Sequence, residues 1–193
     1  MVPKTVAQRR AMKSATLSLP LSRWSVLLAA CGGVGYTPGH PIVNGAMVTS
    51  LATPFLLWPL YVYAGPVAVA LVALAFVLFG TAALMDIHQH GKPSDFDARP
   101  VVIDEFVGAA FVLALGWPWL HLFAGNGEVF AELGTGIQLL YLGLLFRVFD
   151  ILKPWPASWL DVKWHSPFSI IADDLVAAFY AALVAPLPFV LLH

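Results

Sequence analysis

The sequence predicts an all-α membrane protein: a polytopic helical bundle with about five spans and a short N-terminal helix before them. Composition supports this class, because 60% of the 193 residues are hydrophobic and only 11% are charged. A soluble domain has nearer half apolar residues and a quarter charged ones. Several apolar runs also reach the roughly 20 residues that a helix needs to cross a bilayer. The net charge of −1 gives no sign of a nucleic-acid partner.

Five apolar runs are predicted to cross the membrane. They are Ala46–Val62, Pro66–Met85, Ile103–Leu122, Val129–Leu152 and Ser169–Leu192. The tight turn Tyr63–Gly65 joins the first two into an αα-hairpin. A polar loop is predicted at Asp86–Pro100. A second loop, at Lys153–Pro167, is rich in Trp and Pro and is expected to lie along the membrane interface.

The chain before these spans is predicted to divide at residue 24. Residues 1–23 form a polar basic tail, and residues 24–193 form a single membrane-embedded domain. No short apolar run with a small-residue cleavage site follows the basic start, so the tail is expected to be retained. Trp24–Ala30 is apolar but too short to cross a bilayer, and glycines and prolines follow it. We therefore expect an interfacial or re-entrant helix there.

All 10 Lys and Arg residues fall on one side of this topology. Five precede the first span, two lie between the second and third spans, and three lie at or after the end of the fourth. The turns on the opposite side contain none. Because basic residues mark the cytoplasmic side of membrane proteins, this side is predicted to face the cytoplasm.

Three predicted helix ends bring carboxylates to the same side. The acids are Asp104 and Glu105 at the start of the third span, Asp150 near the end of the fourth, and Asp173 and Asp174 near the start of the fifth. Arg147 precedes Asp150 by three positions and so shares its helix face. Helix capping and one ion pair explain some of these acids singly. Adjacent acid pairs at two helix starts exceed what capping requires, and ionisable groups at a membrane boundary are costly unless they are paired or used.

The charge balance of this group predicts a metal. The five acids exceed Arg147 and Lys153 by three negative charges, which repel one another strongly in a medium of low dielectric constant. A hard divalent cation offsets such charge, and ligands that are all oxygen favour Mg²⁺ or Ca²⁺ over zinc. Arg147 and Lys153 are then available for phosphate oxygens. These residues suit the hydrolysis of a phosphomonoester on a lipid headgroup.

The histidines carry weaker signals. His165 follows the fourth span and is a possible general acid or base, although a structural role is the simpler interpretation. His88 and His90 are expected to be solvated loop residues. The single cysteine, Cys31, excludes an intrachain disulfide.

Three sequence blocks resemble the bacterial phosphatidylglycerophosphatase A family. They are VVIDEFVG at Val101–Gly108, FRVFDILKPWP at Phe146–Pro156 and IIADDLVAA at Ile170–Ala178, and their order and spacing also agree. The family usually has a further aspartate seven residues before Asp104, and Asp97 fills that position. An alternative alignment around HQHG places Gln89 there. The loop Gly33–Pro38 fits the first half of the family's N-terminal Gly/Pro segment, whereas the residues after it fit the second half poorly.

The resemblance implies a Mg²⁺-dependent phosphatase of the bacterial inner membrane that converts phosphatidylglycerophosphate to phosphatidylglycerol. The five acids, with Asp97 as a further candidate ligand, would bind the metal and catalyse hydrolysis, while Arg147 and Lys153 would hold the phosphate. Direct attack by water is preferred over a phospho-enzyme, and the oligomeric state stays open. Two alternatives remain: a phosphatase for another lipid phosphate, and a cation- or proton-coupled carrier. Carriers usually place their acids at mid-membrane and often show repeated halves, which the sequence does not.

Overall fold

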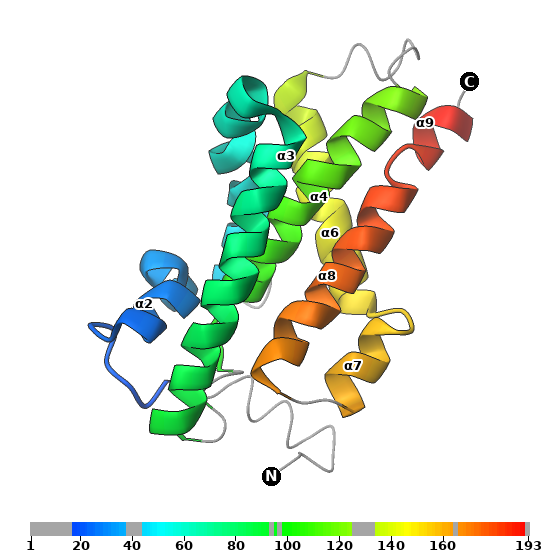
Figure 1. Cartoon of the computed structure of the whole chain (residues 1–193). Helices are drawn as coiled ribbons and strands as arrows, with labels where there is room; N and C mark the ends of the chain where they lie inside the picture. Colours follow the sequence, from blue (N-terminus) through cyan, green and yellow to red (C-terminus); the bar gives the residue numbers. More distant parts are fainter. Residues whose placement is uncertain are drawn as a thin grey trace.

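The computed structural model describes residues 17–37, 44–92, 95, 98–124, 134–163 and 166–191, and its regular elements there are all helices. They are α2 (Trp24–Ala29), the 3₁₀ helix η1 (Cys31–Tyr36), α3 (Gly45–His90), α4 (Ile103–Ala124), α6 (Thr135–Leu152), α7 (Ala157–Lys163), α8 (Pro167–Val184) and α9 (Leu187–Leu191). Figure 1 shows α2 and α7 near one end of the bundle and α9 at the other. Within the described residues, four helices are long and apolar enough to cross a membrane, which confirms the predicted class.

Helix α3 doubles back on itself at Gly65. This residue has φ 77° and ψ 179°, a non-helical conformation that glycine adopts without steric cost. Thr53 and Phe76, on either side of it, line the same cavity. In a straight helix their 23-residue separation would place them about 35 Å apart. The predicted hairpin is therefore present, and α3 supplies two arms that are each long enough to cross the membrane.

Helix α4 lies at the centre of the bundle, in contact with α3, α6, α8 and α9. Small residues let its neighbours approach closely. A Cβ atom on Gly108 would lie 2.4 Å from the Phe146 ring of α6, and Ala109 and Ala110 are fully buried. Since lipid tails are as apolar as leucine, such close packing, rather than hydrophobicity, holds helices together in a membrane.

Helix α3 extends beyond the end that hydropathy predicts. The predicted loop Asp86–Pro100 begins with residues 86–90, which form the last turns of the helix. Asp86 is held there by Arg23, whose Nε and Nη2 donate to its two carboxylate oxygens at 2.7 Å, and by the Ser25 hydroxyl at 2.6 Å. The apolar run ends at Met85, but the helix continues because α2 and the residue before it supply partners for its first charged residue.

Two predicted spans also differ in extent. Helix α6 begins at Thr135 rather than Val129, and residues 129–133 lie outside the described part of the chain. The final span is not continuous, because α8 ends at Val184 and α9 starts after Pro186. Proline has no amide hydrogen and cannot continue the helical ladder. The Tyr141 hydroxyl donates to the Ala185 carbonyl at 2.9 Å and so satisfies a group near this break.

The predicted interface loop Lys153–Pro167 contains a helix, α7. Prolines are tolerated at the start of a helix, and the amide of Ala157 donates to the Pro154 carbonyl at 2.8 Å. Helix α7 packs against α8, where the Tyr180 hydroxyl donates to the Trp155 carbonyl at 2.9 Å. These contacts between distant residues order a segment whose composition is that of a loop.

The glycine-rich helix η1 packs directly against the segment that leads into α4. A Cβ atom on Gly35 would lie 1.9 Å from the Pro100 carbonyl oxygen. We therefore expect Gly35→Ala to lower the stability by about 1–3 kcal/mol, because the backbone segments must separate. The measurement is the thermal unfolding temperature of the purified protein in detergent.

Gly136→Ala in α6 is the matched control for this prediction. A Cβ atom there would meet only the Phe55 ring, at an ordinary 3.9 Å. Alanine is also a better helix former than glycine, so this variant should be as stable as the unmodified protein or more so. Equal unfolding temperatures for the Gly35 and Gly136 variants would contradict the close approach of η1 to Pro100.

Candidate functional site

Three carboxylates meet between the start of α4 and the N-terminal half of α8. Asp104 and Glu105 lie in the first turn of α4, and Asp174 lies about two turns into α8. One oxygen from each lies within 4.8 Å of the other two. Asp174 is only 3% exposed, while Asp104 and Glu105 are partly buried. Helix packing thus brings together acids that are about 70 residues apart in the chain.

Arg147 connects α6 to this cluster. Its Nη1 atom lies 2.6 Å from Asp150 Oδ2, the i,i+3 partner on the same helix, and 3.7 Å from Glu105 Oε1 on α4. The three side chains are only 12–13% exposed. A guanidinium this deeply buried would strongly destabilise the fold if it had no acidic partner, and here it has two.

Lys153 makes the second ion pair of the site. It caps the C-terminus of α6 in a left-handed conformation, φ 43°, with its amide donating to the Phe149 carbonyl at 2.8 Å. Its ammonium group forms an ion pair with Asp173 Oδ2 on α8. Asp173 is only 3% exposed, so this pair fixes the end of α6 against α8.

The structure therefore brings all seven predicted site residues to one end of the bundle, in two kinds of environment. Three acids face one another, whereas Asp150 and Asp173 are each bound to a base. Asp97 and His165 lie outside the described residues. The geometry is compatible with the predicted site, and the individual roles stay predictions.

Several polar atoms of this site are buried and unpaired. Asp104 Oδ1, Glu105 Oε2, Asp174 Oδ2 and Arg147 Nε make no hydrogen bond to any described residue. Buried polar groups, and charged ones above all, are normally paired or coordinate a metal. Ligands at 2.0–2.1 Å from a Mg²⁺ ion lie about 3–4 Å apart, a spacing that the three-acid cluster can reach. The three carboxylates therefore fit a hard divalent cation, and the Nε group of Arg147 remains available to donate a hydrogen bond to a ligand.

Sequence reasoning missed two other acids that are bound by distant partners. Asp86 bridges Arg23 and Ser25, as described above, and Asp95 is fully buried. Asp95 Oδ2 accepts hydrogen bonds from the Ser18 and Lys92 amides at 3.1 and 3.0 Å. Both acids hold the N-terminal segment against the bundle. No local sequence signal could identify them, because Arg23 and Ser18 are 63 and 77 residues away from their partners.

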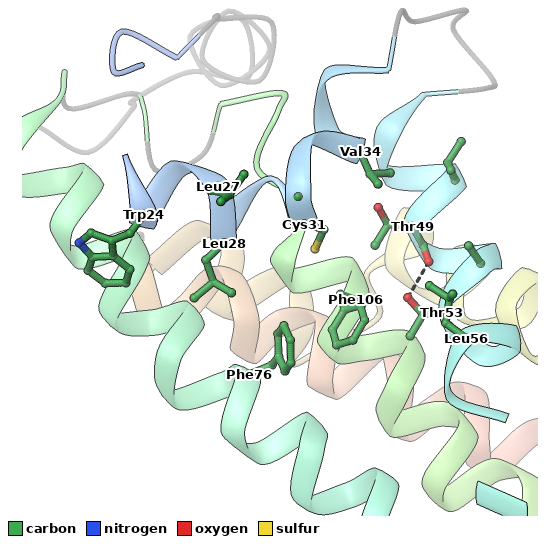
Figure 2. A pocket seen from close by; sticks show the side chains of 13 residues that line it. Trp24, Leu27, Leu28, Cys31, Val34, Thr49, Thr53, Leu56, Phe76 and Phe106 are labelled. Carbon is green, nitrogen blue, oxygen red and sulfur yellow. Dashed lines mark hydrogen bonds between the residues drawn. The ribbon is translucent and has the colours of Figure 1, made fainter. Parts of the chain in front are cut away.

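A cavity of about 480 Å³ lies beside the start of α4 (Figure 2). Helices α2 and η1, both arms of α3 and Phe106 of α4 line it. Cys31 belongs to its wall and donates through its sulfur to the Val102 carbonyl at 3.6 Å. Burial raises the pKa of the Cys31 thiol to about 12, and the negative charges of Asp104 and Glu105 add to the effect. The cavity wall is thus in contact with the segment that leads into α4.

The fold and the site define an integral membrane protein of helical class, with a buried site of acids and bases at one end of its bundle. Comparison with known proteins agrees: the profile of the phosphatidylglycerophosphatase A family matches residues 27–188. The chain belongs to this family, as the three sequence blocks predict. The match includes all seven predicted site residues.

Two curated relatives carry the same description, phosphatidylglycerophosphatase A. The protein of Escherichia coli K12 is 30% identical over 156 residues, which cover 77% of this chain and 76% of the relative. The protein of Haemophilus influenzae Rd is 38% identical over 109 residues, which cover 54% of this chain and 50% of that relative. No solved structure matches the chain.

Proposed function

We propose that this protein hydrolyses phosphatidylglycerophosphate to phosphatidylglycerol and inorganic phosphate at the cytoplasmic face of a bacterial inner membrane. The observation that carries the proposal is the cluster of Asp104, Glu105 and Asp174 beside Arg147. Each of these four residues has a buried polar atom without a hydrogen-bond partner among the described residues. The family and the names of the relatives support the choice of lipid.

A Mg²⁺ ion would be held by Asp104, Glu105 and Asp174. Asp150 and Asp173 would be further candidate ligands at the same end of the bundle, where they pair with Arg147 and Lys153. When bound, it would neutralise phosphoryl charge and lower the pKa of a water molecule. Arg147 would donate its unpaired Nε to a phosphate oxygen, and Lys153 would add positive charge at the edge of the site.

The hydrolysis itself needs a base, a nucleophile and a leaving group. Water attacks phosphorus and forms the new P–O bond, while a carboxylate oxygen such as Asp174 Oδ2 accepts its proton. The bond from phosphorus to the terminal glycerol oxygen breaks. That oxygen takes the proton from the Asp174 carboxyl group and leaves as the hydroxyl of phosphatidylglycerol, which restores the carboxylate. The two ion pairs orient Arg147 and Lys153 toward the same end of the bundle.

The test is an assay of the purified full-length protein in detergent, with phosphatidylglycerophosphate as substrate. We expect inorganic phosphate to be released with Mg²⁺, to cease with a chelator and to resume on addition of excess Mg²⁺. Activity that persists in chelator would overturn the metal assignment. Cation flux in liposomes without phosphate release from any lipid would instead favour the carrier. Activity with another lipid phosphate only would correct the substrate.

A further inference from the structure

The cavity beside the start of α4 has a wall suited to hydrocarbon. Among the described residues that line it, the polar groups are the Cys31 thiol, the Trp24 indole N–H and the hydroxyls of Thr49 and Thr53. The Thr53 hydroxyl donates to the Thr49 carbonyl at 2.8 Å (Figure 2). The remaining lining is aliphatic, aromatic or glycine. The rings of Phe76 and Phe106 pack together with their centroids 4.5 Å apart. The volume of about 480 Å³ lies within the roughly 300–1,000 Å³ of ligand sites, but the described lining residues offer no charge to a headgroup.

The rim of the cavity is open to the surroundings of the bundle. Trp24 is 55% exposed and Leu56 is 70% exposed, and both line it. Because the chain spans a membrane, apolar side chains exposed at this position lie against lipid or at the interface. A phospholipid can therefore reach the cavity from the bilayer without passing through water.

The inner wall of the cavity lies near the start of α4, the helix that carries Asp104 and Glu105. Phe106 follows Glu105 directly in α4, and the Cys31 sulfur contacts the carbonyl of Val102, two residues before Asp104. Thr49 adds a polar group: its hydroxyl oxygen is buried, and it makes no hydrogen bond to a described residue. The ester carbonyl that joins an acyl chain to glycerol is an acceptor that such a hydroxyl can satisfy.

We propose that this cavity holds one acyl chain of the phospholipid whose headgroup lies at Asp104, Glu105 and Asp174. This assignment rests on the proposed function and extends it to the part of the substrate away from the phosphate. The chain lies between α2 and the first arm of α3, its ester end beside Thr49. Arg23 and Asp86 act as positioning residues, since their ion pair holds α2 over the cavity.

The cavity acts through orientation rather than through hydrophobic affinity. A chain that moves from the bilayer to this wall leaves one apolar environment for another, so little transfer free energy is gained. Fixing the chain does fix the headgroup, and misplacement of a reacting group by about 1 Å can cost a factor of about 100 in rate. The expected signature is a preference for long-chain over short-chain substrate in kcat/KM.

Filling the cavity should remove this preference. Ala52 is partly buried in its wall, and Ala52→Phe places a ring where the chain would lie. We expect about a tenfold loss of kcat/KM for dioleoyl phosphatidylglycerophosphate and little change for the dibutyryl analogue. Ala82→Phe, on an exposed position of α3 outside the lining, is the matched control and should retain the preference.

A measurement on the unmodified protein makes the test independent of any variant. The protein in nanodiscs is photolabelled with phosphatidylglycerophosphate carrying a diazirine in one acyl chain, and with phosphatidylcholine carrying the same chain. We expect the first lipid to label cavity residues such as Leu28 and Val48 at least several-fold more than the second. Equal labelling would mean that bulk lipid fills the cavity and would overturn the proposal.

The outcomes separate the two proposals. If the unmodified protein hydrolyses the lipid but Ala52→Phe keeps the chain-length preference, the acyl site is wrong and the phosphatase function stands. If the unmodified protein hydrolyses neither substrate, the phosphatase function fails. Headgroup-dependent photolabelling of the cavity would still support a chain site in that case.

Discussion

Asp174→Asn is expected to lower kcat for phosphate release by about a thousandfold, which corresponds to about 4 kcal/mol of lost transition-state stabilisation. Asparagine preserves the shape of the side chain but removes the charge of a carboxylate that is 3% exposed and grouped with Asp104 and Glu105. A metal ion bound at this position would lose one of its three carboxylate ligands, and the phosphoryl group would no longer be held beside a fully liganded ion. The measurement is phosphate release at saturating lipid and Mg²⁺.

The same substitution should change stability in the opposite direction when no metal is present. Three carboxylates within 4.8 Å repel one another, so removal of one charge should raise the unfolding temperature in chelator. Addition of Mg²⁺ should stabilise the unmodified protein, by about 2.7 kcal/mol at 100 times Kd, and the variant much less. Lower activity together with higher stability in chelator cannot result from misfolding.

Asp86→Asn is the control for this linkage. Asp86 is an acid of the same membrane face, but it is paired with Arg23 and lies outside the three-acid group. Its substitution should lower stability equally with and without Mg²⁺, since it breaks the contact between Arg23 and α3. If Asp174→Asn retained both the activity and the Mg²⁺-dependent stabilisation, the metal site would have to lie elsewhere.

The sequence predicts the class of the protein and its apolar helices well, because the bilayer imposes a simple requirement on length and polarity. It predicts helix ends less well, because these depend on distant partners. Residues 86–90 stay helical although all but Ile87 are polar, and Arg23, 63 residues away, binds Asp86. Pro186 divides α8 from α9 inside a run that hydropathy treats as continuous.

The gathering of the acids at one end could be predicted for a similar reason. Consecutive passes run in opposite directions, so the start of the third span, the end of the fourth and the start of the fifth share a face. The pairing within the group could not be predicted, because it depends on the rotation of each helix about its axis. Asp173 and Asp174 are adjacent but point about 100° apart around α8. One consequently binds Lys153 of α6, while the other joins the two acids of α4.

Arg147→Lys is the second substitution with a large expected effect, a loss of about a hundredfold in kcat/KM. The guanidinium reaches Asp150 and Glu105 through Nη1 and keeps Nε free of any described partner. A lysine ammonium retains the charge but has no rigid fork, so it cannot hold both acids and also present a donor to phosphate. Arg99→Lys, on an exposed side chain, is the matched control and should leave kcat/KM unchanged.

The kinetic pattern distinguishes phosphate binding by Arg147 from a purely structural role. If Nε contacts the phosphate, KM should rise and kcat should fall, with most of the thermal stability retained because the positive charge is still present. If Arg147 only joins α6 to α4, the unfolding temperature should fall while the folded fraction keeps its kcat/KM. The second pattern would remove Arg147 from the phosphate site but leave the three facing acids of α4 and α8 in place.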